Sequence, residues 1–123
     1  MTQFALVAAS IYGLLGVVLG AFGAHALSAR LSPEMQSIWH TAVQYQFFHV
    51  AALLAVGVLA RQGMTSGALS VAGVCFTLGT LVFSGSLYLL ALSGVRWLGA
   101  ITPLGGVLLI LGWLALLWAV TRG

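Results

Sequence analysis

Long apolar stretches separated by short polar breaks dominate the chain. A helix that crosses a bilayer needs roughly 20 mostly apolar residues, and four stretches qualify, at about residues 4–27, 41–60, 67–92 and 100–120. The breaks between them read SARLSPEMQ, RQGMTS and SGVRW. Because short connections make consecutive helices antiparallel neighbours, the pattern predicts one all-α transmembrane domain over residues 1–123, an integral membrane four-helix bundle.

The second helix is expected to begin before its membrane-crossing part. Ser32 followed by Pro33 is typical of an N-cap and a first helical position. Glu34, the only acidic residue of the chain, is well placed there because the N-terminal end of a helix dipole is positive. The first turns of this helix should therefore lie at the membrane surface or lean across it.

The composition supports a lipid environment. Hydrophobic residues make up 62% of the chain and charged residues only 4%, whereas an ordinary soluble domain carries roughly 25% charged residues. So little charge cannot cover a surface that faces water. The arginines form no basic stripe, so we expect no nucleic-acid binding. All of them fall in or beside the breaks, where a bilayer tolerates charge: Arg30, Arg61, Arg96 and Arg122.

The predicted location is a membrane that the chain crosses several times, with an uncleaved first helix. No Lys or Arg precedes the first apolar run, and the run is too long for the core of a signal peptide. Two arginines fall on each side of the membrane, so the positive-inside rule hardly separates the two orientations. We expect both termini in the cytoplasm. The single cysteine, Cys75, lies inside an apolar run and is expected to pack there.

Small residues recur along one face of the first span. At about 100° per residue they fall within an arc of roughly 80°: Ala5, Ala9, Gly13, Gly16, Gly20 and Gly23. Such a face lets helix backbones approach closely in lipid. Two interpretations stay open at this point, packing against other helices of the same chain and a seam between two copies. His25 lies about 120° or more away from this face and points elsewhere.

Two further stretches carry small residues where helices are expected to pack. FSGSLY, at residues 83–88, places Ser84 and Ser86 around Gly85 in a helix. ITPLGG, at residues 101–106, places Pro103 in the first turn of the fourth helix, where its missing N–H costs little. Gly105 and Gly106 then allow a close backbone approach.

Polar residues collect in one half of the membrane. Antiparallel connectivity brings the end of the first helix, the start of the second, the end of the third and the start of the fourth to one side. The opposite half reads VAALLAVGVLA and GVLLILGWLALLWAV. The candidate residues of a polar pocket are His25, His40, Gln44, Tyr45, His49, Ser84, Ser86, Tyr88, Arg96 and Thr102.

Within the second helix, polar side chains share one broad arc near its start, and Gln46 and Phe48 depart from this pattern. His49 lies about 13 Å further along the axis than His40. At that depth it should meet a partner from another helix. Glu34 is expected at the water-exposed end of the bundle, where it would form an ion pair with Arg30.

Neither a metal site nor an enzyme is expected. Zinc takes three or four ligands in a tetrahedral array, but His49 is too deep to join His25 and His40, and no H-x-x-x-H or C-x-x-C spacing occurs. No aspartate and no G-x-S-x-G motif is present, so a serine–histidine hydrolase lacks its usual parts. No cofactor is predicted.

The chain resembles a known family over almost its whole length. LGAFGAHAL, WHTAVQYQFFH, FSGSLYLLAL and ITPLGG followed by LGW are similar to the motifs of the domain-of-unknown-function family 423, and they occur in the family's order. That family comprises small bacterial membrane proteins, with eukaryotic relatives of the transmembrane protein 256 type. The resemblance implies four transmembrane helices and, in bacteria, residence in the inner membrane. It implies no activity and no catalytic residue.

Two functions stay open. The first is a non-enzymatic membrane protein, an assembly or accessory subunit, whose polar pocket bonds its own helices or a lipid. The alternative is a minimal transporter or proton-linked channel that uses His25, His40 and His49. A third interpretation, a redox accessory that binds a quinone, depends on finding a copurified cofactor. The expected partners are membrane lipids and a second copy of the chain or a larger membrane complex.

Overall fold

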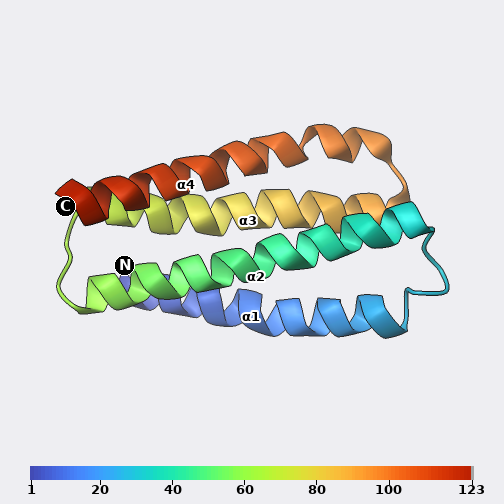
Figure 1. The fold of residues 1–123 in the computed structure, drawn as a ribbon, viewed down its shortest axis with the longest axis horizontal. Helices are drawn as coiled ribbons and strands as arrows, with labels where there is room; N and C mark the ends of the chain where they lie inside the picture. The colour runs from blue at the N-terminus through green and yellow to red at the C-terminus, as the bar shows by residue number, and fades with distance from the viewer. Residues whose placement is uncertain (123) are drawn as a thin grey trace.

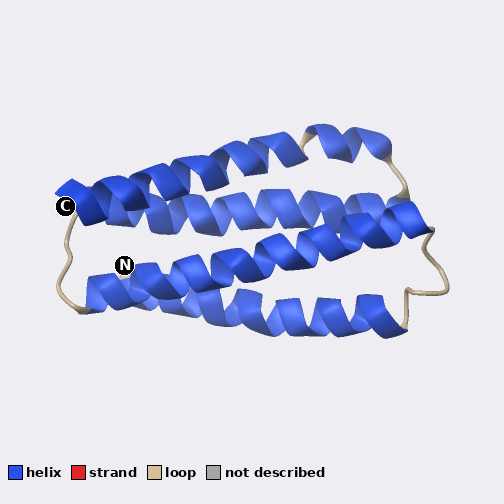
Figure 2. Cartoon of the chain, in the orientation of Figure 1, coloured by secondary structure: helices blue, strands red, loops and turns tan. Residues whose placement is uncertain are grey.

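The structure is a computed structural model that describes residues 1–122. In this part of the chain four long helices lie antiparallel, and helix accounts for nearly all residues (Figures 1 and 2). They are α1 (Thr2–His25), α2 (Pro33–Arg61), α3 (Gly67–Ser93) and α4 (Thr102–Arg122), with a short 3₁₀-helix η1 (Arg96–Ala100) before α4. Each long helix, with η1 joined to α4, is long and apolar enough to cross a membrane. The predicted all-α bundle of four membrane-spanning helices is confirmed.

Local sequence explains where the helices begin and end. The Ser32 hydroxyl accepts a hydrogen bond from the Met35 N–H at 3.2 Å, and Pro33 opens α2, as the sequence predicts. The helix α3 ends at Ser93, and the Gly94 that caps it has a φ of +71°, which is left-handed and suits glycine. The third break, expected as a loop, holds η1.

The helices pack in chain order. The helix α2 packs on α1 and on α3, and α4 packs on α3, whereas α1 touches α3 only lightly. The start of α1 and the end of α4 lie at the end of the bundle where α2 turns into α3 (Figure 1). We call this the terminal end. The opposite end, where α1 turns into α2 and α3 into α4, is the hairpin end.

The core has two apolar parts with polar side chains between them. The larger part lies toward the terminal end and includes Leu53, Val56, Leu69 and Phe76. A smaller part at the hairpin end contains Leu27, Trp39 and Ala91. The buried polar side chains are Gln46, His49, Thr80, Ser84 and Ser86.

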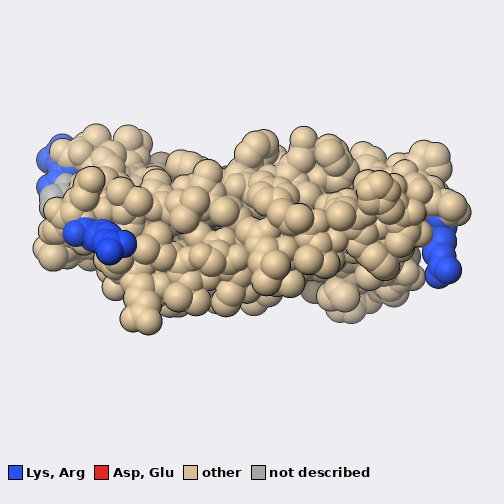
Figure 3. Space-filling model, turned by 90° about the horizontal axis from the view of Figure 1, so that it is seen from below, with Lys and Arg blue, Asp and Glu red and all other residues tan. Residues whose placement is uncertain are grey.

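Charge is confined to the two ends of the molecule. On the face seen in Figure 3, the arginine atoms lie at either end and the long middle carries none. A bilayer accepts charge at its surfaces and not in its hydrocarbon centre. The bundle axis is therefore aligned with the membrane normal, with one end at each surface.

Candidate functional site

Gln46 lies at the centre of a hydrogen-bond network that joins three helices. Its side chain is 3% exposed. Its amide Nε2 donates to the Tyr12 carbonyl of α1 at 2.7 Å, and its Oε1 accepts from the Tyr88 hydroxyl of α3 at 2.7 Å. In a lipid environment a buried amide without partners would cost several kcal/mol. Gln46 is therefore a polar link between α1, α2 and α3.

Two more side chains of the hairpin half bond to the backbone of a neighbouring helix. Ser84 of α3 donates to the Ala42 carbonyl of α2 at 2.7 Å. The Trp39 indole N–H of α2 donates to the Leu19 carbonyl of α1 at 2.9 Å. These bonds connect helices that share an apolar surface, where packing alone holds them weakly in lipid.

His49 is held at both ring nitrogens. Its Nδ1 lies 2.7 Å from the Tyr45 carbonyl one turn earlier. Because a carbonyl only accepts, Nδ1 carries the hydrogen, and Nε2 accepts from the Trp113 indole N–H of α4 at 3.1 Å. The expected partner from another helix is thus Trp113, which the sequence did not single out.

The α3–α4 contact is close at the start of α4. The hydroxyls of Ser86 and Thr102 lie 2.5 Å apart. A Cβ on Gly105 would come within 2.8 Å of the Phe83 Cα, so only glycine fits at this crossing. Gly106 is less constrained, because its Cβ would lie 3.8 Å from the Phe83 ring.

Four other residues that the sequence predicts for a polar pocket take no part in these contacts between helices. His25, His40, Gln44 and Tyr45 are exposed on the outer surface near the hairpin end or toward lipid. Within residues 1–122, no three His, Cys or acidic side chains come together as a group fit for a metal ion.

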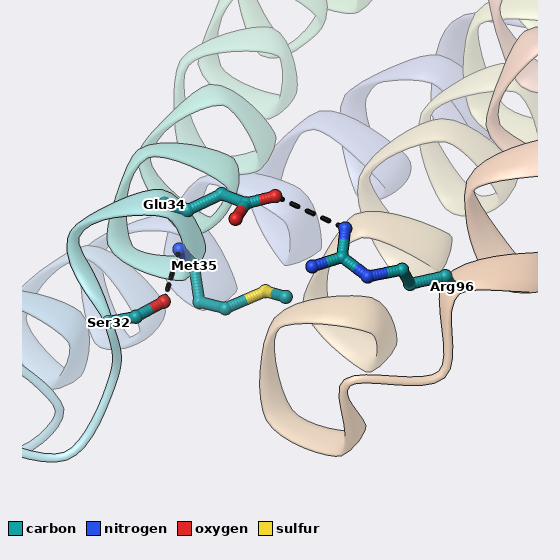
Figure 4. Close-up of polar contacts among 4 residues, drawn as sticks. All are labelled: Ser32, Glu34, Met35 and Arg96. Carbon is teal, nitrogen blue, oxygen red and sulfur yellow. Dashed lines mark hydrogen bonds and ion pairs between the residues drawn. The ribbon is translucent and has the colours of Figure 1, made fainter.

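Glu34 pairs with Arg96 and not with Arg30, so that expectation was wrong. The carboxylate oxygen of Glu34 lies 3.2 Å from an Arg96 guanidinium nitrogen, and both side chains are largely exposed, at 60% and 72% (Figure 4). Figure 4 also shows Glu34 close to the Ser32 cap, on the first turn of α2. The fold brings the α3–α4 connection next to the start of α2, a proximity that the sequence order does not reveal.

The glycine face of α1 packs within the chain. A Cβ on Gly16 would lie 2.8 Å from the Phe47 ring, a Cβ on Gly20 3.4 Å from Val43, and one on Gly23 would overlap the Trp39 indole. Gly13 faces Val50 at a looser 3.8 Å. Of the two interpretations, the structure shows packing on α2 within the same chain. Gly85 differs from all of these, because a Cβ there would meet no atom within 4 Å.

The sequence does not single out three residues of these contacts between helices. Gln46 is only a departure from a helical pattern, and Tyr12 and Trp113 belong to apolar spans. One signal was available: a glutamine in a membrane span must bond to something, because lipid offers it no partner. The partners of these residues lie on other helices, and the sequence around each partner does not identify it.

Comparison with known proteins agrees with the motifs. Residues 19–106 match the model of a family described as "Protein of unknown function (DUF423)". The UPF0382 membrane protein SERP0230 of Staphylococcus epidermidis is 45% identical over 117 residues, which cover 95% of this chain and 94% of that protein.

Two other relatives extend this range. The UPF0382 membrane protein YwdK of Bacillus subtilis is 40% identical, over 95% of each chain. The UPF0382 inner membrane protein YgdD of Escherichia coli K12 is 41% identical, over 98% of this chain and 92% of its own. No solved structure matches. The chain therefore belongs to the DUF423 family, also named UPF0382, of multi-pass membrane proteins.

Proposed function

We propose that this chain is a non-enzymatic accessory protein of the membrane, which keeps a defined shape in the bilayer and contacts lipids or other membrane proteins along α1 and α4. One observation carries the proposal. The buried polar side chains Gln46, His49 and Ser84 are bonded to backbone or side-chain atoms of the bundle itself. Polar groups used in this way hold helices together and are not free for chemistry.

The outer helices offer the surface for such contacts. The helix α1 buries only Ala5, Ala9 and Gly16, and α4 buries only four of its residues. Their outward faces carry large apolar side chains in helical spacing: Val7, Ile11, Leu14 and Val18 on α1, and Leu104, Val107, Ile110 and Leu114 on α4. In a bilayer these faces meet acyl chains or the helices of other proteins.

The arrangement of the histidines favours this function over proton transport. A relay residue must bind and release a proton along a path of similar groups. In His49, Nδ1 donates to the Tyr45 carbonyl and Nε2 accepts from the Trp113 indole N–H. From His49 toward the terminal end, the core of residues 1–122 is formed by apolar side chains such as Leu53, Val56 and Leu69. This leaves no row of exchangeable groups across that half of the described bundle.

A flux measurement separates the two functions. Proteoliposomes with an entrapped pH-sensitive dye and an imposed pH gradient should leak protons no faster than empty liposomes. The transporter would be supported instead by flux that His49→Ala abolishes and Gln44→Ala preserves. Gln44 is the matched control because it lies on the same helix and faces outward.

Cross-linking in native membranes tests the accessory role. A photoreactive residue placed at Leu14 of α1 or at Leu114 of α4 should give a reproducible cross-link to a protein, either a second copy or another membrane protein. The same residue at buried Leu53 is the control and should give cross-links only within the chain. Cross-links to lipid alone from both outer positions would contradict the accessory role and leave only the lipid contacts of the proposal.

A further inference from the structure

A seam between α1 and α3 holds a small hollow of about 130 Å³ in the hairpin half of the bundle. It exists because these two helices touch only lightly along their length. Its wall includes Tyr12 of α1, Gln46 of α2, and Thr80, Gly85 and Tyr88 of α3. Three helices therefore contribute polar groups to one cavity inside the membrane-spanning part of the protein.

Thr80, one of the wall residues, has an unpaired hydroxyl that its neighbours enclose. Its side chain is 3% exposed, and its Oγ1 is the one buried side-chain polar atom of residues 1–122 that lacks a hydrogen-bond partner. Other helical threonines bond back to the preceding turn, as Thr77 does to the Gly73 carbonyl at 2.8 Å. A buried hydroxyl without a partner costs about 1–3 kcal/mol. This orphaned donor points to a bound molecule that supplies an acceptor.

The remaining polar groups of the wall are already engaged. Tyr12 donates to the Thr77 carbonyl at 2.6 Å, and Tyr88 donates to Gln46. The side of the hollow at Gly85 is open, since a Cβ there would meet nothing within 4 Å. The hollow thus has two aromatic walls and an unobstructed side, and the unused donor of Thr80 lies just behind its wall.

A second, apolar hollow continues the same seam toward the terminal end. Its volume is about 520 Å³, and it shares Tyr12 with the first. Phe4, Val7 and Ile11 of α1 line it, together with Thr77 of α3, whose hydroxyl is bonded within its own helix. A hydrocarbon chain that leaves the small hollow past Tyr12 would lie along this surface.

Depth decides which kind of molecule fits. Thr80 is midway between Gly67 and Ser93, so it lies about 20 Å from either end of α3 and near the bilayer centre. The head group and ester carbonyls of a phospholipid are held near the polar boundary of the bilayer. An uncharged carbonyl compound that dissolves in the hydrocarbon has no such restraint.

We propose that the α1–α3 seam binds an uncharged, lipid-soluble carbonyl compound of the quinone class, whose ring occupies the small hollow and whose hydrocarbon tail lies in the apolar hollow. Its carbonyl accepts the Thr80 hydroxyl once that side chain has rotated about χ1 toward the hollow. The inference concerns binding and does not rest on the accessory function proposed above. The proposal includes no redox step.

Trp39 offers a direct readout, since its ring centroid lies 4.7 Å from that of Tyr88 in the wall of the hollow. The full-length protein in detergent is titrated with decylubiquinone, and tryptophan fluorescence is recorded. The expected result is saturable quenching. Thr80→Val should weaken binding about 5- to 10-fold, as expected for one lost hydrogen bond, whereas Thr80→Ser keeps the hydroxyl and should bind within about 2-fold of wild type.

Gly85→Leu fills the open side of the hollow and should abolish saturable quenching. Gly67→Leu is the matched control, because it lies on the same helix, also has no atom within 4 Å of its Cβ position, and is remote from the hollow. Thermal unfolding of each variant verifies that it folds. If Gly85→Leu does not fold, Gly85→Ala takes its place, with a weaker but measurable loss of binding.

Three outcomes would overturn the proposal. Quenching that is linear in quinone, or unchanged in both Thr80→Val and Gly85→Leu, reflects partition into the micelle. Saturable binding of oleic acid in place of decylubiquinone, with the same dependence on Thr80, would assign the seam to an acyl carbonyl. Absence of saturable quenching in the wild type, together with a Thr80→Val protein that is more stable than the wild type, would mean that the hollow binds no quinone.

Discussion

The indole N–H of Trp113 on α4 donates to Nε2 of His49 on α2 across 3.1 Å, although 64 positions separate the two residues in the chain. The rings also meet edge to face, with centroids 5.9 Å apart. This pair connects α4 to α2, whereas the main packing partner of α4 is α3. The histidine that most resembles a transport residue in the sequence thus has a structural explanation.

Loss of this hydrogen bond should weaken the attachment of α4. Trp113→Phe keeps the aromatic contact with Phe76, whose centroid lies 5.0 Å away, but removes the donor to His49. We expect the free energy of unfolding to fall by about 0.5–2 kcal/mol, the range for hydrogen bonds between helices in membranes. Unfolding by SDS in mixed micelles measures it. Trp118→Phe, at an exposed position of the same helix, should change it by less than about 0.5 kcal/mol, and equal effects would contradict the role of His49.

Gln46 should be the most sensitive polar position of the bundle. Gln46→Leu removes the link to the Tyr12 carbonyl and leaves the Tyr88 hydroxyl buried without its acceptor. The expected loss is about 1–3 kcal/mol in the free energy of unfolding, the cost of an unsatisfied buried group. Gln44→Leu, two residues away and exposed, serves as control. A loss no greater than that of the control would show that the network does not stabilise the fold.

The crossing of α3 and α4 should tolerate no side chain at Gly105. Gly105→Ala places a methyl group against the Phe83 backbone, which can yield only if the helices separate. We expect a loss of about 1–3 kcal/mol, as in overpacked cores. Gly106→Ala, whose methyl would meet the Phe83 ring at 3.8 Å, should be nearly neutral. Thermal unfolding in detergent gives the midpoint temperature of each variant. A lower midpoint for Gly106→Ala than for Gly105→Ala would contradict the observed crossing.

The ion pair at the hairpin end should matter less than the helix cap beside it. Glu34 and Arg96 are exposed, so Glu34→Gln should change the free energy of unfolding by only about 0–1 kcal/mol, and by less in high salt. Ser32→Ala removes the bond to the Met35 N–H and should cost about 1 kcal/mol. The same unfolding assay, run at two salt concentrations, compares the two variants. If Glu34→Gln lowered the free energy of unfolding more than Ser32→Ala at both concentrations, the ion pair would be what holds α2 to the α3–α4 connection.

Local chemistry was enough to predict the elements and the breaks between them. Apolar length sets the four spans, since lipid requires about 20 residues to cross it. Ser32 and Pro33 mark the start of α2, and Pro103 suits the first turn of α4, because caps and missing N–H groups act within one helical turn. The higher number of polar residues in the hairpin half of the bundle also follows from chain order alone.

Only the tertiary structure decided which side chains meet. Helical periodicity states which residues share a face, but a helix that is apolar all round carries no signal for how it is turned in the bundle. The partners of Gln46 on α1 and α3, the pairing of Glu34 with Arg96, the unpaired hydroxyl of Thr80 and the open side of Gly85 all depend on that rotation. In water, hydrophobic faces would turn inward and fix it; in lipid, close packing and a few hydrogen bonds between distant residues do so instead.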